Sequence, residues 1–145
     1  MKTRISDILQ DKQGKIFSVG PKATVFEAIT LMSGNQIGSV LVMDNDHILG
    51  IFTERDYMNK VILMDHSSKE LPVKEVMTTK VAFVTPDTHI EEGLAVMTEK
   101  HCRHLPVLDN KKLVGVVSIG DLVKRIIKDQ KVTIDSLTEY IALSY

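Results

Sequence analysis

Two stretches of the chain share one alternation of apolar and polar positions. When the sequence is shifted by 65 positions, residues 19–62 align without a gap with residues 84–127, and ten of the 44 pairs are identical. Several identities fall on turn-forming residues: Pro21/Pro86, Asp44/Asp109, Asn45/Asn110 and Gly50/Gly115. Chance similarity between two strand–helix stretches would not place identities there, so the chain is predicted to contain an internal repeat.

Each repeat is predicted to be a β-α-β-β-α unit. Short strands are expected at 16–19 and 81–84, each ending at a proline. Helices follow, with Ser/Thr-x-x-Glu capping boxes at 24–27 and 88–91, which lie one residue out of register. The apolar runs at 39–43 with 48–53, and at 104–108 with 113–118, are joined by turn residues and predict buried antiparallel hairpins. Second helices are expected at 54–64 and 119–128.

These elements predict an α+β fold in which the two repeats pack sheet to sheet with pseudo-twofold symmetry. One repeat alone would bury too little surface to be stable, and two packed together solve that problem. The expected organisation is a first repeat at 1–66 that includes a short N-terminal segment, a linker at 67–71, a second repeat at 72–131 and a C-terminal helix at 132–145. Pro72 is expected to open a short helix that introduces the second repeat.

Composition and charge exclude several classes of protein. The chain has 145 residues, 43% of them hydrophobic, which excludes disorder. With 18 basic and 19 acidic side chains, its net charge of -1 offers no basic stripe for nucleic acid. Its apolar runs are far shorter than the ~20 residues that span a bilayer. The single Cys102 cannot form an internal disulfide, and without a signal-peptide pattern a cytoplasmic location is expected.

The candidate chemistry lies where the third strand of each repeat meets the following helix. Thr53 and Asp56 in the first repeat correspond to Ser118 and Asp121 in the second, within a Gly-apolar-x-Ser/Thr-x-x-Asp motif. One interpretation is helix capping alone, since a hydroxyl at the N-cap and an acid three residues later suit any helix start. The other is a nucleotide site, in which helix amides bind phosphate and the carboxylate accepts both hydroxyls of a ribose diol.

The duplicated motif within a duplicated β-α-β-β-α unit resembles a tandem cystathionine β-synthase (CBS) domain pair, also called a Bateman module. The resemblance covers about residues 5–130. It implies a regulatory module that binds an adenosine-containing ligand (AMP, ADP, ATP, S-adenosylmethionine or NAD(H)) in the cleft between the repeats. It also implies a homodimer and an effect in trans on a partner protein, since no effector domain is attached.

Carried over by position, the resemblance assigns ribose contacts to Asp56 and Asp121 and hydroxyl contacts to Thr53 and Ser118. It also assigns the adenine slot to backbone near Lys15, Ile16, Thr79, Lys80 and Val81, and the motif proline to Pro106. Basic groups are needed to offset the phosphate charge, and the candidates are Arg55, Lys80, Arg103 and His104. The first repeat lacks that proline, so unequal affinity is expected and the second-repeat site ranks first. Each basic residue has an alternative interpretation as an ordinary surface charge.

Two other classes of function are an assembly scaffold and an enzyme. A scaffold that binds no ligand and serves only assembly would share the same fold. An enzyme is not expected, because the five histidines are dispersed and neither a Gly-x-Ser-x-Gly motif nor a phosphate loop occurs. A metal site at 101–104 is not expected either, because no second cluster completes four zinc ligands.

Overall fold

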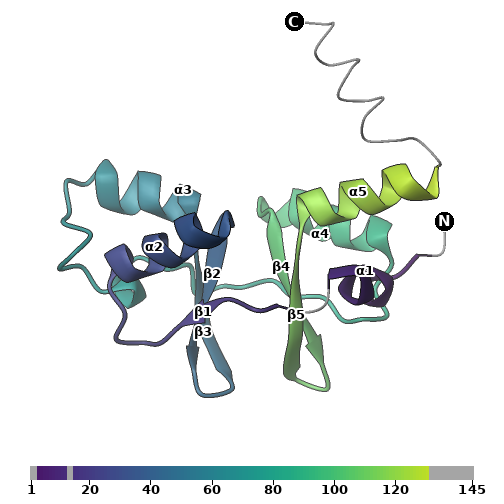
Figure 1. Cartoon of the computed structure of the whole chain (residues 1–145), viewed down its shortest axis with the longest axis horizontal. Coiled ribbons are helices and arrows are strands. Elements are labelled where there is room, and N and C mark those ends of the chain that lie inside the picture. The colour runs from purple at the N-terminus through teal and green to yellow at the C-terminus, as the bar shows by residue number, and fades with distance from the viewer. Residues whose placement is uncertain (1–2, 13–14, 131–145) are drawn as a thin grey trace, which may run out of the picture. The chain divides into compact units, whose positions relative to one another are not determined.

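The computed structural model describes residues 3–12 and 15–130 of the chain (Figure 1). The elements in chain order are α1 (Ile5–Lys12), β1 (Ser18–Val19), α2 (Val25–Asn35), β2 (Ser39–Asp44), β3 (His47–Thr53), α3 (Glu54–Tyr57), the π-helical turn η1 (Met58–Ile62), the 3-10 turn η2 (Val73–Glu75), α4 (Ile90–Lys100), β4 (His104–Asp109), β5 (Lys112–Ser118) and α5 (Ile119–Asp129). The expected α+β fold is confirmed. The expected helix at 132–145 lies outside the described residues.

The 65-residue register of the sequence holds in three dimensions. The bounds of α2, β2 and β3 reappear in α4, β4 and β5 shifted by 65 positions. Both strand pairs are antiparallel hairpins, and both have a register shift at the equivalent place. Asn45 and Asn110 take positive φ angles of 54° and 50° in the turns, which asparagine tolerates better than most residues. The predicted hairpins are therefore confirmed.

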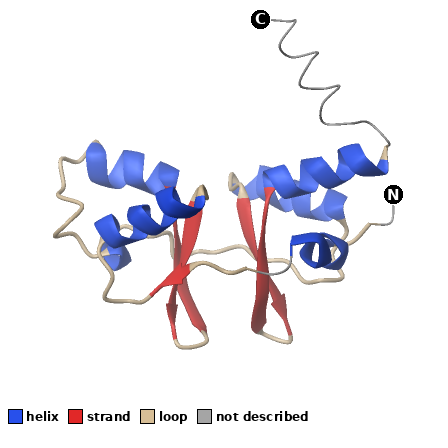
Figure 2. Ribbon diagram, viewed as in Figure 1, coloured by secondary structure: helices blue, strands red, loops and turns tan. Residues whose placement is uncertain are grey.

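The first compact unit comprises residues 16–81 and is called the first-repeat unit. Its sheet has the order β1-β2-β3, with β1 parallel and β3 antiparallel to β2. Val25, Ala28 and Met32 of α2 pack with Val40 of β2 and Phe52 of β3 in a buried apolar cluster. The helices of the unit gather on one side of its strands (Figure 2).

The second compact unit, called the second-repeat unit, joins the described residues up to Lys15 to those from Ala82 onward. Ile5 and Ile8 of α1 are 0% and 3% exposed within the same cluster as Ile90 and Leu105. Likewise, Val73 of η2 is buried in the first-repeat unit. Each short helix that precedes a repeat in sequence therefore packs with the other repeat, so the compact units do not follow the ranges 1–66 and 72–131.

The strand expected at 81–84 is reduced to one bridge, between Val84 and Val107. The physical reason is Pro106. In the first repeat, the amide of Leu41 donates to the carbonyl of Phe17 at 3.3 Å and extends the parallel pairing. Pro106 stands where Leu41 does and has no N–H to donate, so the equivalent bond is missing.

The capping box expected at 88–91 is wrong by one residue. Helix α4 begins at Ile90, and its N-cap is His89, whose amide donates to Glu92 Oε1 at 3.2 Å. Thr88 is used in the preceding turn, where its hydroxyl accepts from the amide of Thr85 at 3.1 Å. The correction restores the repeat, because His89 aligns with Thr24, the N-cap of α2.

Candidate functional site

Both motif aspartates close a reciprocal capping box at a helix start. Thr53 is the N-cap of α3, and its hydroxyl accepts from the Asp56 amide at 3.1 Å. Asp56 Oδ2 in turn accepts from the Thr53 amide at 3.1 Å. Ser118 and Asp121 form the same pair at the start of α5, with distances of 3.1 and 2.8 Å. The capping interpretation is therefore confirmed at both sites, whatever further role the carboxylates have.

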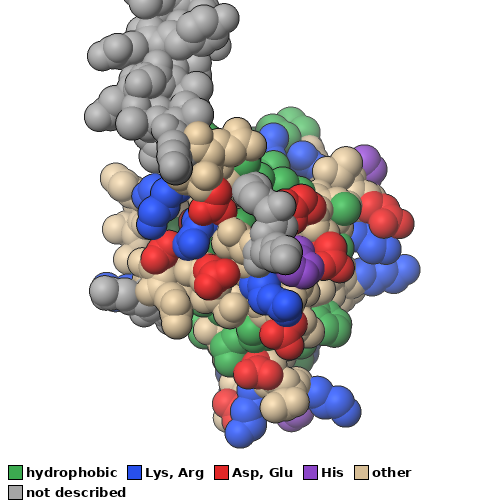
Figure 3. Space-filling view, turned by 90° about the vertical axis from the view of Figure 1, so that its right-hand side faces the viewer, with side chains coloured by type: hydrophobic (Ala, Val, Ile, Leu, Met, Phe, Trp, Pro, Cys, Tyr) green, Lys and Arg blue, Asp and Glu red, His purple; other side chains and the backbone are tan. Residues whose placement is uncertain are grey.

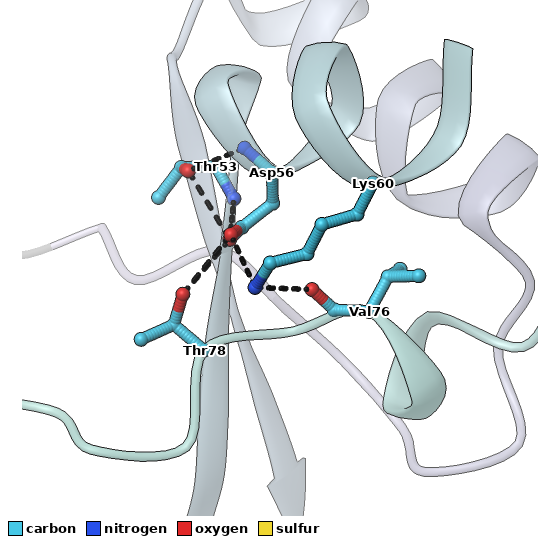
Figure 4. A network of polar contacts seen from close by, with 5 residues as sticks. All are labelled: Thr53, Asp56, Lys60, Val76 and Thr78. Carbon is cyan, nitrogen blue, oxygen red and sulfur yellow. Dashed lines mark hydrogen bonds and ion pairs between the residues drawn. The ribbon is translucent and has the colours of Figure 1, made fainter. Parts of the chain in front are cut away.

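The Asp56 carboxylate is engaged well beyond its cap (Figure 4). The Thr78 hydroxyl lies 3.0 Å from Oδ1 and 3.2 Å from Oδ2, and Lys60 Nζ lies 2.9 Å from Oδ1. The Thr53 hydroxyl contacts Oδ2 at 3.1 Å. Only 8% of the Asp56 side chain is exposed. A buried carboxylate is stable when it is paired and hydrogen-bonded, as it is here.

The Asp121 carboxylate has a different partner. Lys12, at the end of α1, places Nζ 2.8 Å from Asp121 Oδ2 and 2.9 Å from the carbonyl of Val116. Burial tends to raise the pKa of Asp121, but the hydrogen bond and charge of Lys12 and the hydrogen bonds from Ser118 outweigh it and hold the pKa below its ordinary value. Among the described residues, none donates a hydrogen bond to Asp121 Oδ1.

The amides at the two helix starts are partly used inside the protein. The amide of Glu54 donates to the carbonyl of Gly38 at 3.1 Å, and that of Ile119 donates to the carbonyl of Arg103 at 2.8 Å. In each helix the capping hydroxyl accepts a hydrogen bond from one further amide. Fewer amides are therefore available for an anion than the sequence suggested, and a bound phosphate would depend more on cationic side chains.

The hairpin of the second-repeat unit brings most of its candidate residues together. The register pairs His104 with Ser118, so the start of β4 lies beside the end of β5 and the first turn of α5. Arg103, exposed, precedes His104 and bonds α5 through its carbonyl. Pro106 is buried in β4, where its carbonyl accepts a hydrogen bond from the Val84 amide. Lys15, which is exposed, belongs to the same unit.

The other candidates belong to the first-repeat unit, with Thr53, Arg55 and Asp56. Ile16 is half-buried, Thr79 and Lys80 are exposed, and the Val81 amide donates to the Thr79 carbonyl at 3.1 Å. Thr79, Lys80 and Val81 were expected at the entrance to the second repeat, so their membership of the other unit is a difference from the prediction.

Three residues that contact the aspartates were missed from the sequence: Lys12, Lys60 and Thr78. Only Lys60 had a usable signal, because it lies four residues after Asp56 on one helix, a spacing that favours an ion pair. Thr78 and Lys12 lie 22 and 109 residues from their aspartates. Nothing local in the sequence indicates such contacts.

On the face that Figure 3 shows, Lys and Arg side chains are interspersed with Asp and Glu, and no large patch of a single charge is present. In the second-repeat unit, Arg125 pairs with Asp11 at 2.9 Å and Arg4 with Asp87 at 3.7 Å. Residues 3–12 and 15–130 contain no group of three or more His, Cys, Asp or Glu that could hold a metal ion. None of the described helices is long and apolar enough to cross a membrane.

Comparisons with known proteins agree with this architecture. Residues 5–62 and 73–128 match the CBS domain family. A protein with CBS domains from Burkholderia ambifaria has a TM-score of 0.86 and 49% identity, over 91% of this chain and 99% of that chain. The mitochondrial CBS domain-containing protein CBSX3 of Arabidopsis thaliana is 33% identical, over 99% of this chain and 74% of that protein. A CBS domain protein from Pyrobaculum aerophilum complexed with AMP shares the fold, with a TM-score of 0.73 and 23% identity over 82% of this chain and 89% of that chain.

Proposed function

The chain belongs to the CBS domain family, with two CBS domains in tandem, and on that premise we propose that it is a regulatory module that binds an adenosine-containing ligand and carries out no catalytic step. AMP, ADP, ATP, S-adenosylmethionine and NAD(H) are the ligands to compare. AMP is the first probe, because a protein of the same fold is complexed with it.

The observation that carries the proposal is the environment of Asp121. Its carboxylate stands at a helix start with one oxygen that no described residue bonds, and the ammonium of Lys12 lies 2.8 Å from the other oxygen. Arg103 and His104 lie at the neighbouring strand start. A carboxylate can accept both hydroxyls of a ribose, and adjacent cations offset phosphate charge. Ser118 and Asp121 are thus proposed as ligand contacts, with Lys12, Arg103 and His104 as the basic part of the site.

The test is isothermal titration calorimetry of the whole chain with AMP, ADP, ATP, S-adenosylmethionine and NADH. Binding of at least one of them is expected. If an aspartate holds the diol, 2′-deoxy-AMP should bind about tenfold or more weakly than AMP, since a hydrogen bond to a charged group contributes about 1.5–3 kcal/mol. An absence of heat from all five compounds would remove the proposal.

A second candidate function is an assembly scaffold without a ligand. It is favoured by a run of exposed apolar side chains after α3: Met58, Ile62, Leu63 and Met64 are 53%, 53%, 69% and 63% exposed. Such side chains commonly mark contact surfaces. A thermal melt that millimolar nucleotides leave unshifted would support the scaffold, because a ligand that binds only the folded state raises the melting temperature.

We also propose, from the family membership, that the chain forms a homodimer and acts in trans on a partner protein. A cytoplasmic location stays a prediction. Light scattering at micromolar concentration is expected to report twice the 16.2 kDa chain mass. Ile62→Lys should shift that mass toward the monomer if the exposed apolar run makes the contact. A monomer for the wild-type chain would contradict the dimer.

A further inference from the structure

The two motif aspartates differ in how many hydrogen bonds they can still accept. An ionised carboxylate has about four acceptor positions on its two oxygens. A ribose diol needs two of them, one for each hydroxyl. Internal donors gathered on one oxygen therefore leave the other oxygen open to a diol, whereas donors on both oxygens leave no room unless one of them is displaced.

Asp56 has four internal donors. They are the amide and the hydroxyl of Thr53, the hydroxyl of Thr78 and the ammonium of Lys60, at distances from 2.9 to 3.2 Å (Figure 4). Both oxygens are engaged and the side chain is 8% exposed. A diol could reach this carboxylate only by displacing Thr78 or Lys60.

Among the described residues, the donors to Asp121 are the Lys12 ammonium and the amide and hydroxyl of Ser118. The Ser118 amide and the Lys12 ammonium both bond Oδ2, each at 2.8 Å. Oδ1 accepts no hydrogen bond from the described residues, and 23% of the side chain is exposed. The two positions that a diol needs are therefore those on Oδ1.

We infer that the protein binds one ligand per chain, at Asp121, and that Asp56 acts as an internal clamp closed by Thr78 and Lys60. The inference rests on the proposed function and assigns its stoichiometry and its site. The clamp holds the segment that runs on to the second-repeat unit. Thr78 exchanges two backbone hydrogen bonds with Ile51, at 2.8 and 2.9 Å, and Lys60 also bonds the Val76 carbonyl at 3.2 Å.

Sequence differences between the repeats account for the asymmetry. Lys60 aligns with Arg125, which bonds Asp129 and Asp11 at 3.1 and 2.9 Å and not the motif aspartate. With the three-residue adjustment that aligns the short helices, Thr78 corresponds to Gln10, which is exposed and makes no hydrogen bond to Asp121 within the described residues. The second repeat thus lacks both residues that close the first.

The experiment is calorimetric titration of AMP into the wild-type chain and four variants. One site per chain is expected for the wild type, and Asp121→Asn should weaken binding more than tenfold. Asp109→Asn, which makes the same change at the exposed end of β4 in the same unit, is the control and should leave the affinity unchanged. Asp56→Asn should keep one site. Thr78→Val combined with Lys60→Met should open Asp56 and add a second, weaker binding event.

The outcomes separate this inference from the proposed function. Two sites in the wild type, or unchanged binding by Asp121→Asn, would overturn the inference while nucleotide binding stood. If Asp56→Asn fails to fold, as judged by circular dichroism, the wild-type stoichiometry and the affinity of Asp121→Asn still test the inference. A folded double variant that binds a single AMP would show that Thr78 and Lys60 do not close the first site. No binding by the wild type would remove the proposed function and this inference together.

Discussion

The glycine that opens each motif lies where another segment of the chain passes close to the hairpin. A Cβ at Gly50 would lie 2.7 Å from the backbone oxygen of Thr78 and 2.7 Å from Met77 Sδ. A Cβ at Gly115 would lie 2.5 Å from Leu9 Cδ2, and its other two nearest atoms, also in Leu9, are at 3.5 and 3.6 Å. Ordinary Cβ contacts begin near 3.4 Å, so both positions are too tight for alanine.

The two glycines nevertheless predict different costs for the same substitution. At Gly115 a flexible side-chain end must turn, and an off-rotamer side chain costs about 0.5–1.5 kcal/mol. At Gly50 the obstacle includes backbone, and the Thr78 oxygen is held by the Ile51 amide at 2.9 Å. Moving it strains two bridging hydrogen bonds, so Gly50→Ala is expected to lower the free energy of unfolding by about 2–3 kcal/mol, in the range of overpacked sites.

The measurement is urea unfolding followed by circular dichroism, with native-state hydrogen exchange to locate the loss in one unit. Gly34, near the end of α2, has no atom within 4 Å of a built Cβ and is the matched control. Gly34→Ala should raise the free energy of unfolding by about 0.5–1 kcal/mol through helix propensity. A loss for Gly115→Ala equal to or larger than that for Gly50→Ala would refute the reasoning.

Three further predictions concern the helix starts. The pKa of Asp121 is lowered in the folded state, so its contribution to stability should be present above the unfolded-state pKa of about 3.9 and be lost as pH falls through the folded pKa. Lys12→Met should raise the folded-state pKa of Asp121 in an NMR titration. An unchanged pKa would contradict the assigned cause. Thr24→Ala, which removes the N-cap of α2, should cost about 0.5–2 kcal/mol in urea unfolding. His89→Thr should stabilise α4, because His89 Nδ1 is buried without a partner among the described residues and threonine is a better N-cap; a lower melting temperature would count against this.

Much of the fold could be predicted because its signals are local. The hairpins follow from apolar runs separated by turn residues, and the structure reproduces them at the expected positions. The predictions failed where two local signals of similar strength competed, or where a partner across the sheet decided the outcome. Thr88 and His89 were both possible N-caps of α4. The Thr88 hydroxyl is used in a turn with Thr85, so His89 is the N-cap. The strand expected at 81–84 failed because its partner position holds Pro106, a relation across the sheet rather than along the chain.

The candidate site divides in the same way. The motif aspartates and their hydroxyl partners were found from the sequence, because a capping box has a fixed spacing of three residues. The sequence also indicated the short helices, but it did not indicate that Ile5 would be buried with the second repeat.

By itself, the sequence determined the duplication, the order of elements and the two acidic helix starts, since periodicity, turn residues and capping act over a few neighbouring residues. Only the tertiary structure decided that Thr78 and Lys60 hold Asp56 while Lys12 holds Asp121. Two of these three partners reach their carboxylate from a different segment of the chain. Such a contact depends on how the segments pack, so the two copies of one motif acquire different surroundings without any difference in the motif itself.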